Sequence, residues 1–169
     1  MNKFLNFLKG KTSLIILFLL TLGFNWLLSH FMPKEYALDL KFAYNSADVS
    51  YALSSMGAES RSIYQLGVWA LDLPYLFVYG LFTLGLLHRL YGKGIFLLLP
   101  PLVSLMDLCE NFLVLELLDY FPKVDATIAF LTSCFTTTKW VLVAVLLSMI
   151  IVGVLRSVWI KRAALAIEN

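Results

Sequence analysis

Four long apolar runs dominate the sequence and limit the folds that are open to it. Each run is long enough to cross about 30 Å of hydrocarbon as a helix that rises about 1.5 Å per residue. The runs cover residues 13–32, 66–88, 95–118 and 127–155. Because 60% of the residues are hydrophobic and only 14% are charged, the composition supports the same interpretation. We therefore expect an all-α fold, a four-transmembrane-helix bundle that forms a single integral membrane domain over residues 1–169.

The positions of the basic residues predict the orientation of this bundle. With the N-terminus inside, the inner segments hold eight Lys and Arg residues and the outer segments hold four. The outer four are Lys34, Lys41, Arg61 and Lys123. Basic residues gather in cytoplasmic loops, so both termini are predicted to be cytoplasmic. The first run follows a basic stretch but lacks a small-residue cleavage site, and we interpret it as an uncleaved span.

The segment between the first two runs is predicted to hold a short amphipathic helix on the extracytoplasmic side. Asn45 or Ser46 would cap a helix over residues 46–56, and Gly57 would end it. An apolar stripe at helical spacing would place this helix on the bundle mouth or at the lipid interface. The stripe consists of Val49, Ala52, Leu53 and Met56. From Ala58 the chain is predicted to return to helix and to run straight into the second span.

Each apolar run also carries one polar stripe at helical spacing. These stripes are Thr21, Asn25 and Ser29; Arg61, Gln65, Trp69, Asp72, Tyr75, Tyr79 and Thr83; Ser104, Asp107, Glu110 and Asn111; and Thr132, Thr136 and Lys139. A polar group that faces lipid has no partner, so we expect the four stripes to converge inside the bundle. The adjacent Pro100 and Pro101 are predicted to kink the third helix.

The charges inside this predicted bundle do not balance. Counted from the outer ends, Asp72, Glu110 and Asn111 lie about 10 Å deep, and Asp107 and Lys139 about 16–18 Å deep. Lys139 is expected to pair with one acid. The surplus carboxyl groups must then be protonated, reach Arg61 or water, or meet a cationic ligand.

These residues predict a polar, acidic pocket that is open toward the outer leaflet and binds a lipid or a small amphiphile. Its predicted ligand-binding residues are Asp72, Tyr75, Tyr79, Asp107, Glu110, Asn111, Lys139, Arg61 and Trp69. One alternative is an intramembrane enzyme acting on a lipid-like substrate, with Asp107 or Glu110 as general acid or base and Lys139 or Asn111 as electrophilic partner. Others are a purely structural protein and a proton-coupled transporter, which with four spans would need a homo-oligomer.

Several other functions are disfavoured by the sequence. Cys109 and Cys134 form no C-x-x-C pair, and His30 and His88 are far apart. A net charge of +2 without a basic cluster gives no sign of nucleic acid binding. Oxygen ligands from the acidic stripe would suit a divalent metal, but Lys139 at the same depth argues against one. We expect no metal and no cofactor, and membrane lipids as the partners.

Three motifs carry a resemblance to known proteins. "LDLPYLFVYG", "DLCEN" and "FTTTKW", after the loop "YALSSMGAESRSIY", resemble a group of small, uncharacterised four-helix bacterial membrane proteins over residues 40–145. The resemblance implies a four-span bundle in a bacterial inner membrane but no activity. Its motif positions are Asp72, Pro74, Tyr79, Asp107, Glu110, Asn111, Lys139 and Trp140. The layout is also loosely similar to that of the EXPERA-type sterol isomerases and sigma-2 receptors, without a match of motifs.

Overall fold

The computed structural model describes residues 2–33 and 35–167, and these residues form helices without any strand. The all-α class expected from the sequence is therefore confirmed. Lys34, which was part of the count of outer basic residues, lies outside the described residues. The helices are α1 (Asn2–Leu8), α2 (Lys11–Phe31), the 3₁₀ turn η1 (Leu38–Leu40), α3 (Ser46–Ser55), α4 (Ala58–Gly67), the π-helical turn η2 (Val68–Asp72), α5 (Leu73–Tyr91), the 3₁₀ turn η3 (Ile95–Leu98), α6 (Leu99–Tyr120) and α7 (Ala126–Ile167).

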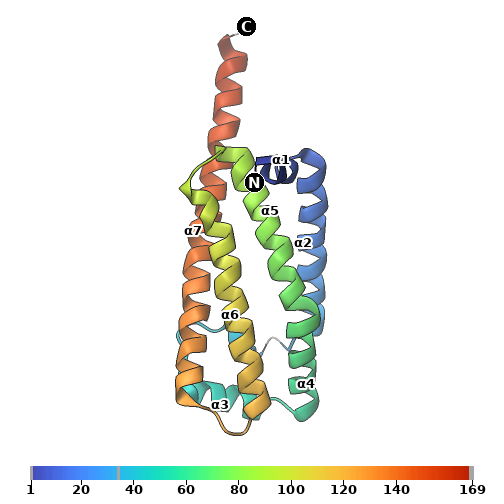
Figure 1. Ribbon diagram of the computed structural model, residues 1–169, viewed down its shortest axis with the longest axis vertical. Coiled ribbons are helices and arrows are strands. Elements are labelled where there is room, and N and C mark those ends of the chain that lie inside the picture. The colour runs from blue at the N-terminus through green and yellow to red at the C-terminus, as the bar shows by residue number, and fades with distance from the viewer. Residues whose placement is uncertain (1, 34, 168–169) are drawn as a thin grey trace.

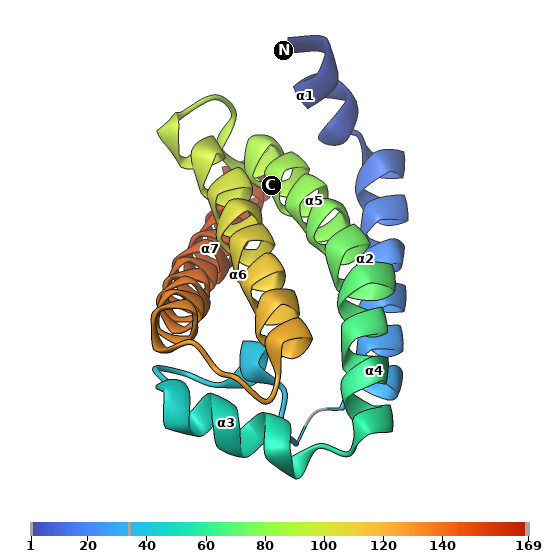
Figure 2. The same ribbon diagram turned by 60° about the horizontal axis from the view of Figure 1, so that its bottom comes forward.

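Four helices among the described residues are long and apolar enough to span a membrane. They cover Lys11–Phe31, Ala58–Tyr91, Ile95–Tyr120 and Ala126–Ile160, in agreement with the four apolar runs. Figure 1 shows them side by side in the order α2, α5, α6 and α7. Helix α2 packs mainly on α5, whereas α6 packs on both α5 and α7. Helix α2 is thus peripheral, and both views place it away from α7 (Figures 1 and 2).

The segment between the first two spans closes one end of the bundle. Helix α3 lies across that end, as Figure 2 shows. Its start is fixed by a capping box, in which the Asn45 side chain accepts from the backbone of Asp48 and the Asp48 carboxylate accepts from the Asn45 N–H at 2.8 Å. The predicted apolar stripe of α3 is fully buried against the ends of α4, α6 and α7. It meets Tyr64, Val68, Val114, Leu117 and Ala129 in one hydrophobic core.

A π-helical turn changes the face that the second span presents to the bundle. Over Val68–Asp72 the backbone pattern is wider than in an α-helix, so that the N–H of Leu73 bonds to the carbonyl of Val68. Asp72 is buried as a result, while Trp69 turns outward and is 53% exposed. The prediction that Trp69 and Asp72 share one face was wrong, because it assumed an uninterrupted α-helical repeat.

The adjacent prolines begin α6 and do not kink it. Pro100 and Pro101 lie in the first turn of this helix, directly after η3. In a first turn the missing N–H of proline removes no helical hydrogen bond, and its fixed φ suits the start of a helix. The predicted kink is therefore replaced by a change from 3₁₀ to α-helix at Leu99.

Candidate functional site

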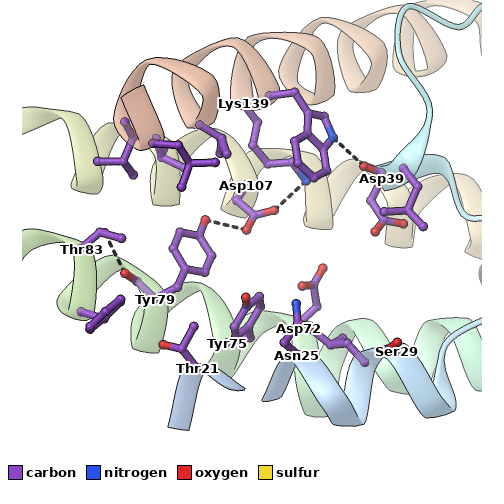
Figure 3. A pocket seen from close by; sticks show the side chains of 18 of the residues that line it. Thr21, Asn25, Ser29, Asp39, Asp72, Tyr75, Tyr79, Thr83, Asp107 and Lys139 are labelled. Atoms are coloured by element: carbon purple, nitrogen blue, oxygen red, sulfur yellow. Dashed lines mark hydrogen bonds and ion pairs between the residues drawn. The ribbon is translucent and has the colours of Figure 1, made fainter. Parts of the chain in front are cut away.

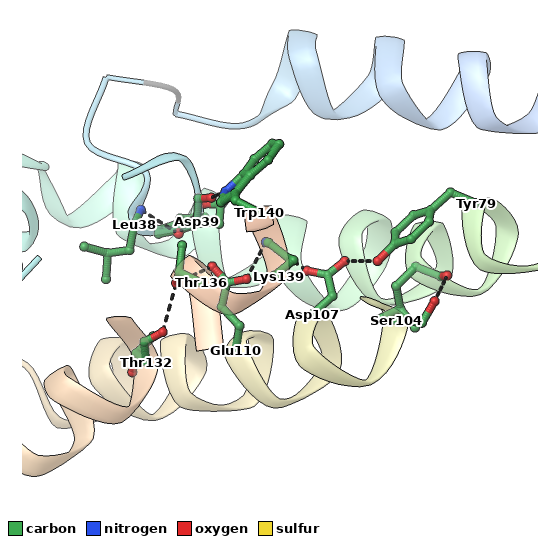
Figure 4. A network of polar contacts seen from close by, with 12 residues as sticks. Leu38, Asp39, Tyr79, Ser104, Asp107, Glu110, Thr132, Thr136, Lys139 and Trp140 are labelled. Atoms are coloured by element: carbon green, nitrogen blue, oxygen red, sulfur yellow. Dashed lines mark hydrogen bonds and ion pairs between the residues drawn. The ribbon is translucent and has the colours of Figure 1, made fainter. Parts of the chain in front are cut away.

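A buried cation links α6 to α7. The Lys139 Nζ lies 3.0 Å from Asp107 Oδ1 and forms a second ion pair with Glu110 Oε2. All three side chains are almost completely buried, and Glu110 has no exposed surface. Figure 4 shows the lysine between the two carboxylates, which lie one helical turn apart on α6. The expected pairing of Lys139 with an acid is confirmed, but the lysine pairs with two acids, and both belong to α6.

A tyrosine joins the second span to this pair. The Tyr79 hydroxyl donates to Asp107 Oδ2 at 2.7 Å, so both oxygens of that carboxylate are occupied. Nearby, the Ser104 hydroxyl donates to the carbonyl of Leu76 at 3.1 Å, which adds a second polar contact between α5 and α6. These contacts fix Asp107 between three helices.

The second acid of the pair connects the network to the loop that follows η1. The Thr136 hydroxyl donates to Glu110 Oε1 at 2.7 Å, and the Tyr44 hydroxyl lies 3.2 Å from Thr136 Oγ1. The backbone N–H of Tyr44 donates to the Ser133 hydroxyl at 2.9 Å. Burial raises the pKa of the Tyr44 phenol, so this ring stays neutral and remains a hydrogen-bond donor. Glu110 is thus held from the loop side as well as by Lys139.

The η1 turn brings a further acid to the same region. The Tyr64 hydroxyl donates to Asp39 Oδ1 at 2.7 Å and accepts from the N–H of Leu38 at 3.0 Å. From the other side, the indole N–H of Trp140 donates to the Asp39 carbonyl at 2.9 Å. Residues from α4 and α7 therefore clamp this short turn and fix the position of Asp39.

A cavity of about 690 Å³ lies between α2 and α5 on one side and α6, α7 and η1 on the other. Figure 3 shows its polar side chains. They are Thr21, Asn25, Ser29, Asp39, Asp72, Tyr75, Tyr79, Thr83, Asp107 and Lys139. The rest of the lining is mainly apolar, including Phe18, Phe82, Leu147 and Ile150. The cavity therefore joins a charged region to an apolar one, which suits a molecule with one polar end.

Asp72 is the acid that the network does not use. Its side chain is only 8% exposed, and Figure 3 shows it pointing from the wall formed by the second span into the cavity. Within residues 2–33 and 35–167, its carboxylate makes no hydrogen bond and no ion pair. Around Lys139 the described residues place four carboxyl groups, those of Asp39, Asp72, Asp107 and Glu110.

The structure brings together five of the nine predicted ligand-binding residues. Those that line the cavity are Asp72, Tyr75, Tyr79, Asp107 and Lys139. Glu110 and Asn111 do not line it, although both are buried next to the network, and Asn111 Nδ2 has no hydrogen-bond partner among the described residues. Asp107 lies on the side of α6 that faces the cavity. The next turn of α6, which carries Glu110 and Asn111, faces α7 instead.

Two predicted ligand-binding residues lie outside the cavity. The guanidinium of Arg61 donates to the carbonyls of Leu53 and Met56 at the end of α3 and lies 4.4 Å from the Phe121 ring centroid. Trp69 faces away from the network because of the π-helical turn, and its ring meets Phe112 edge-on. Arg61 therefore does not neutralise the surplus acids.

Several cavity residues were absent from the predicted ligand set, among them Asp39, Asn25 and Trp140. Asp39 lies in a short apolar stretch of the loop, where a lone acid between Leu38 and Leu40 was the only signal. Asn25 entered only as part of the polar stripe of the first span, and Trp140 only as a motif position. No group of three or more His, Cys, Asp or Glu side chains in the described part of the chain is placed to hold a metal ion.

The four apolar helices and the charged groups buried between them define a multi-pass helical membrane protein. No family model matches the chain, and comparisons with curated proteins and with solved structures give no match either. The resemblance carried by the three motifs therefore stays a prediction, and the chemistry of the cavity alone has to indicate a function.

Proposed function

We propose that this protein binds a lipid or a small amphiphile in the cavity between α2, α5, α6 and α7. The observation that carries the proposal is the cavity of about 690 Å³, which has acidic and basic groups at one end and apolar walls beyond them. Ligand pockets of such a size are mostly apolar, with a few polar groups that fix the orientation of the ligand.

The apolar part of the cavity is long enough for a hydrocarbon tail. Along α7 the lining continues from Lys139 to Ile150, a distance of about 16 Å at the helical rise per residue. Phe18 from α2 and Phe82 from α5 line the same part. Because α2 packs mainly on α5, the side between α2 and α7 offers a route by which a tail could enter from the surrounding lipid.

The polar contacts favour binding over acid–base catalysis. Both oxygens of Asp107 are occupied, by Tyr79 and by Lys139, and Glu110 does not line the cavity. A general base needs a free oxygen within reach of the proton that it abstracts. The second candidate is an intramembrane enzyme, which the hydrogen-bonded chain Tyr79–Asp107–Lys139 at the cavity wall supports. A change in the amount of one lipid class in cells that overproduce the protein would favour this candidate.

For the orientation, we propose that the end closed by α3 faces outward and that both termini are cytoplasmic. The asymmetry of Lys and Arg supports this arrangement, which would open the cavity toward the outer leaflet of a bacterial inner membrane. A reporter fused within the loop at Lys93 should then be cytoplasmic, and one fused near Lys41 should be external. The reverse pattern would contradict the proposed orientation.

Binding can be tested by quantifying the lipids and amphiphiles that remain with the purified protein, by native mass spectrometry and by extraction. The parent protein should retain about one molecule per chain. Leu147→Trp places a large ring at the apolar lining and should reduce this occupancy several-fold. Val145→Trp is the matched control, because Val145 lies on the same helix with similar exposure and does not line the cavity. Equal occupancy in both variants, or none in the parent, would contradict the proposal.

A further inference from the structure

We infer that the ligand of this cavity is a cationic amphiphile, an aliphatic ammonium whose charge lies between Asp72 and Asp39. The inference rests on the proposed function and names the chemical class that the site selects. Its first support is that Asp72 is buried, points into the cavity and has no hydrogen bond or ion pair with any described residue. A buried carboxylate without a partner is costly, and a cation held beside it would offset that cost.

The lysine of the site is not free to neutralise Asp72. Its ammonium group already contacts Asp107 and Glu110, and it donates to Asp107 Oδ1 at 3.0 Å. Asp39 and Asp72 add two carboxyl groups to the two that Lys139 contacts, so four ionised carboxyl groups would leave an excess of negative charge around this one lysine. Arg61, the other cation of the second span near this end, is bound to α3. Neither Lys139 nor Arg61 therefore supplies a positive charge to Asp72, and a cationic ligand in the cavity would supply one.

Asp39 stands opposite Asp72. Figure 3 shows the two carboxyl groups facing the cavity from opposite walls, one on the η1 turn and one at the end of the π-helical turn. The Asp39 carbonyl is bound by Trp140 and its Oδ1 by Tyr64, so its position is fixed before a ligand arrives. The remaining oxygen is available to a donor in the cavity. An ammonium group, which donates several hydrogen bonds, can use both carboxylates.

Aromatic side chains complete this end of the cavity. The rings of Tyr75 and Tyr79 lie 5.2 Å apart between centroids, next to Asp72 in the lining, and Trp140, which donates to the Asp39 carbonyl, lines the cavity as well. Aromatic faces attract cations. A phosphate or carboxylate head would instead meet two like charges, and the only ammonium that lines the cavity within the described residues already has two acids.

The test uses the full-length protein in a neutral maltoside detergent and three ligands with the same dodecyl chain and different heads: ammonium, hydroxyl and carboxylate. Dissociation constants are measured by competition against one bound fluorescent amphiphile. We expect the amine to bind at least about tenfold more tightly than the alcohol, which corresponds to about 1.4 kcal/mol, and the carboxylate to bind most weakly. Equal binding of all three would overturn the cationic ligand but leave the proposed function intact. No binding of any of them would overturn both.

Asp72→Asn provides the residue-level test, because it keeps the shape of the side chain and removes its charge. We expect it to bring the affinities for amine and alcohol within about threefold of each other while leaving the alcohol unchanged. Glu116→Gln is the matched control, since Glu116 is an exposed acid of α6 that does not line the cavity. The ligands differ in how strongly they partition into micelles, but this difference is the same for Asp72→Asn and Glu116→Gln. The comparison of the two variants therefore reports on the protein alone. A preference that survives in Asp72→Asn would overturn the inference.

A second variant keeps the test decisive if Asp72→Asn does not fold. Asp39→Asn can still accept from the Tyr64 hydroxyl and retains its backbone contact with Trp140. It too should weaken the amine selectively, and an unchanged preference in this variant would count against the paired carboxylates.

An aliphatic ammonium can belong to a phospholipid head or to an amine that carries no phosphate. Displacement of the bound fluorescent amphiphile by phosphatidylethanolamine in mixed micelles would assign the first source. Displacement by dodecylamine but not by phosphatidylethanolamine would assign the second. Displacement by phosphatidylglycerol as effective as by either would overturn the inference, because that lipid carries no cation.

Discussion

Lys139 Nζ lies 3.0 Å from Asp107 Oδ1, and this contact joins α7 to α6 inside a bundle of long apolar helices. The same lysine also meets Glu110, so one cation serves two acids of one helix. The pair holds Asp107 at the cavity wall with Tyr79 on its other oxygen. The position of the polar end of the cavity therefore depends on this ion pair.

Removal of the lysine should be strongly destabilising. Lys139→Met leaves two buried carboxyl groups without their cation, and we expect the free energy of unfolding to fall by about 3–5 kcal/mol. Adding Asp107→Asn should recover part of the loss, and a further Glu110→Gln should recover more. Thermal unfolding in detergent gives the measurement, with Lys123→Met at an exposed position as the control. Purely additive losses in the combined variants would show that these residues are not coupled.

The hydrogen bond between Tyr79 and Asp107 should contribute less than the ion pair. Tyr79→Phe removes the hydroxyl that lies 2.7 Å from Asp107 Oδ2, and a loss of about 1–3 kcal/mol is expected for a bond to a charged group. Tyr51→Phe is a suitable comparison because Tyr51 is 66% exposed and should tolerate the change. Equal stability of the two variants would mean that the bond is not formed in the folded protein.

Gly85 marks a close approach between α5 and the end of α1. A Cβ atom at this position would lie 2.7 Å from the carbonyl oxygen of Leu8, a backbone atom that cannot move aside by rotation. Gly85→Ala should therefore destabilise by about 1–3 kcal/mol, as overpacking does. At Gly23 a Cβ would meet nothing within 4 Å, so Gly23→Ala should stabilise α2 by up to about 1 kcal/mol. The two shifts in thermal midpoint should have opposite signs, and equal signs would contradict the close approach.

The Asp125 carboxylate should make the stability of the protein vary with pH in the acidic range. Its side chain accepts from the N–H groups of Ile128 and Thr127 at the start of α7, and these bonds hold its pKa below the usual 3.8. A lowered folded pKa contributes stability that is present above the unfolded pKa and is lost as the pH falls through the folded value. Asp125→Asn can keep the cap but cannot titrate.

The measurement for Asp125 is the thermal midpoint of the parent and of Asp125→Asn between neutral pH and about pH 3. The parent should lose more stability than the variant below about pH 4. The other carboxyl groups titrate equally in both proteins, so only the difference between the two curves reports on this cap. Parallel curves would show that Asp125 does not contribute.

The helical spans and the pairing of charges could be predicted from the sequence. Apolar length sets the four spans, and helical spacing places Asp107 and Glu110 on one face of α6. Since a charged group in an apolar interior needs a partner, Lys139 and these acids had to meet. The start of α3 could be predicted as well, because a capping box depends only on residues three positions apart.

Which residues face the cavity was decided only by the tertiary structure. The π-helical turn rotates Trp69 away from the cavity and buries Asp72. The carbonyls at the end of α3 accept hydrogen bonds from Arg61, which therefore does not reach the cavity. Asp39 reaches the cavity because Tyr64 and Trp140 hold its turn. Each of these outcomes depends on hydrogen bonds within an irregular backbone or between segments distant in the chain. A helical repeat describes one helix at a time and contains no information about such contacts.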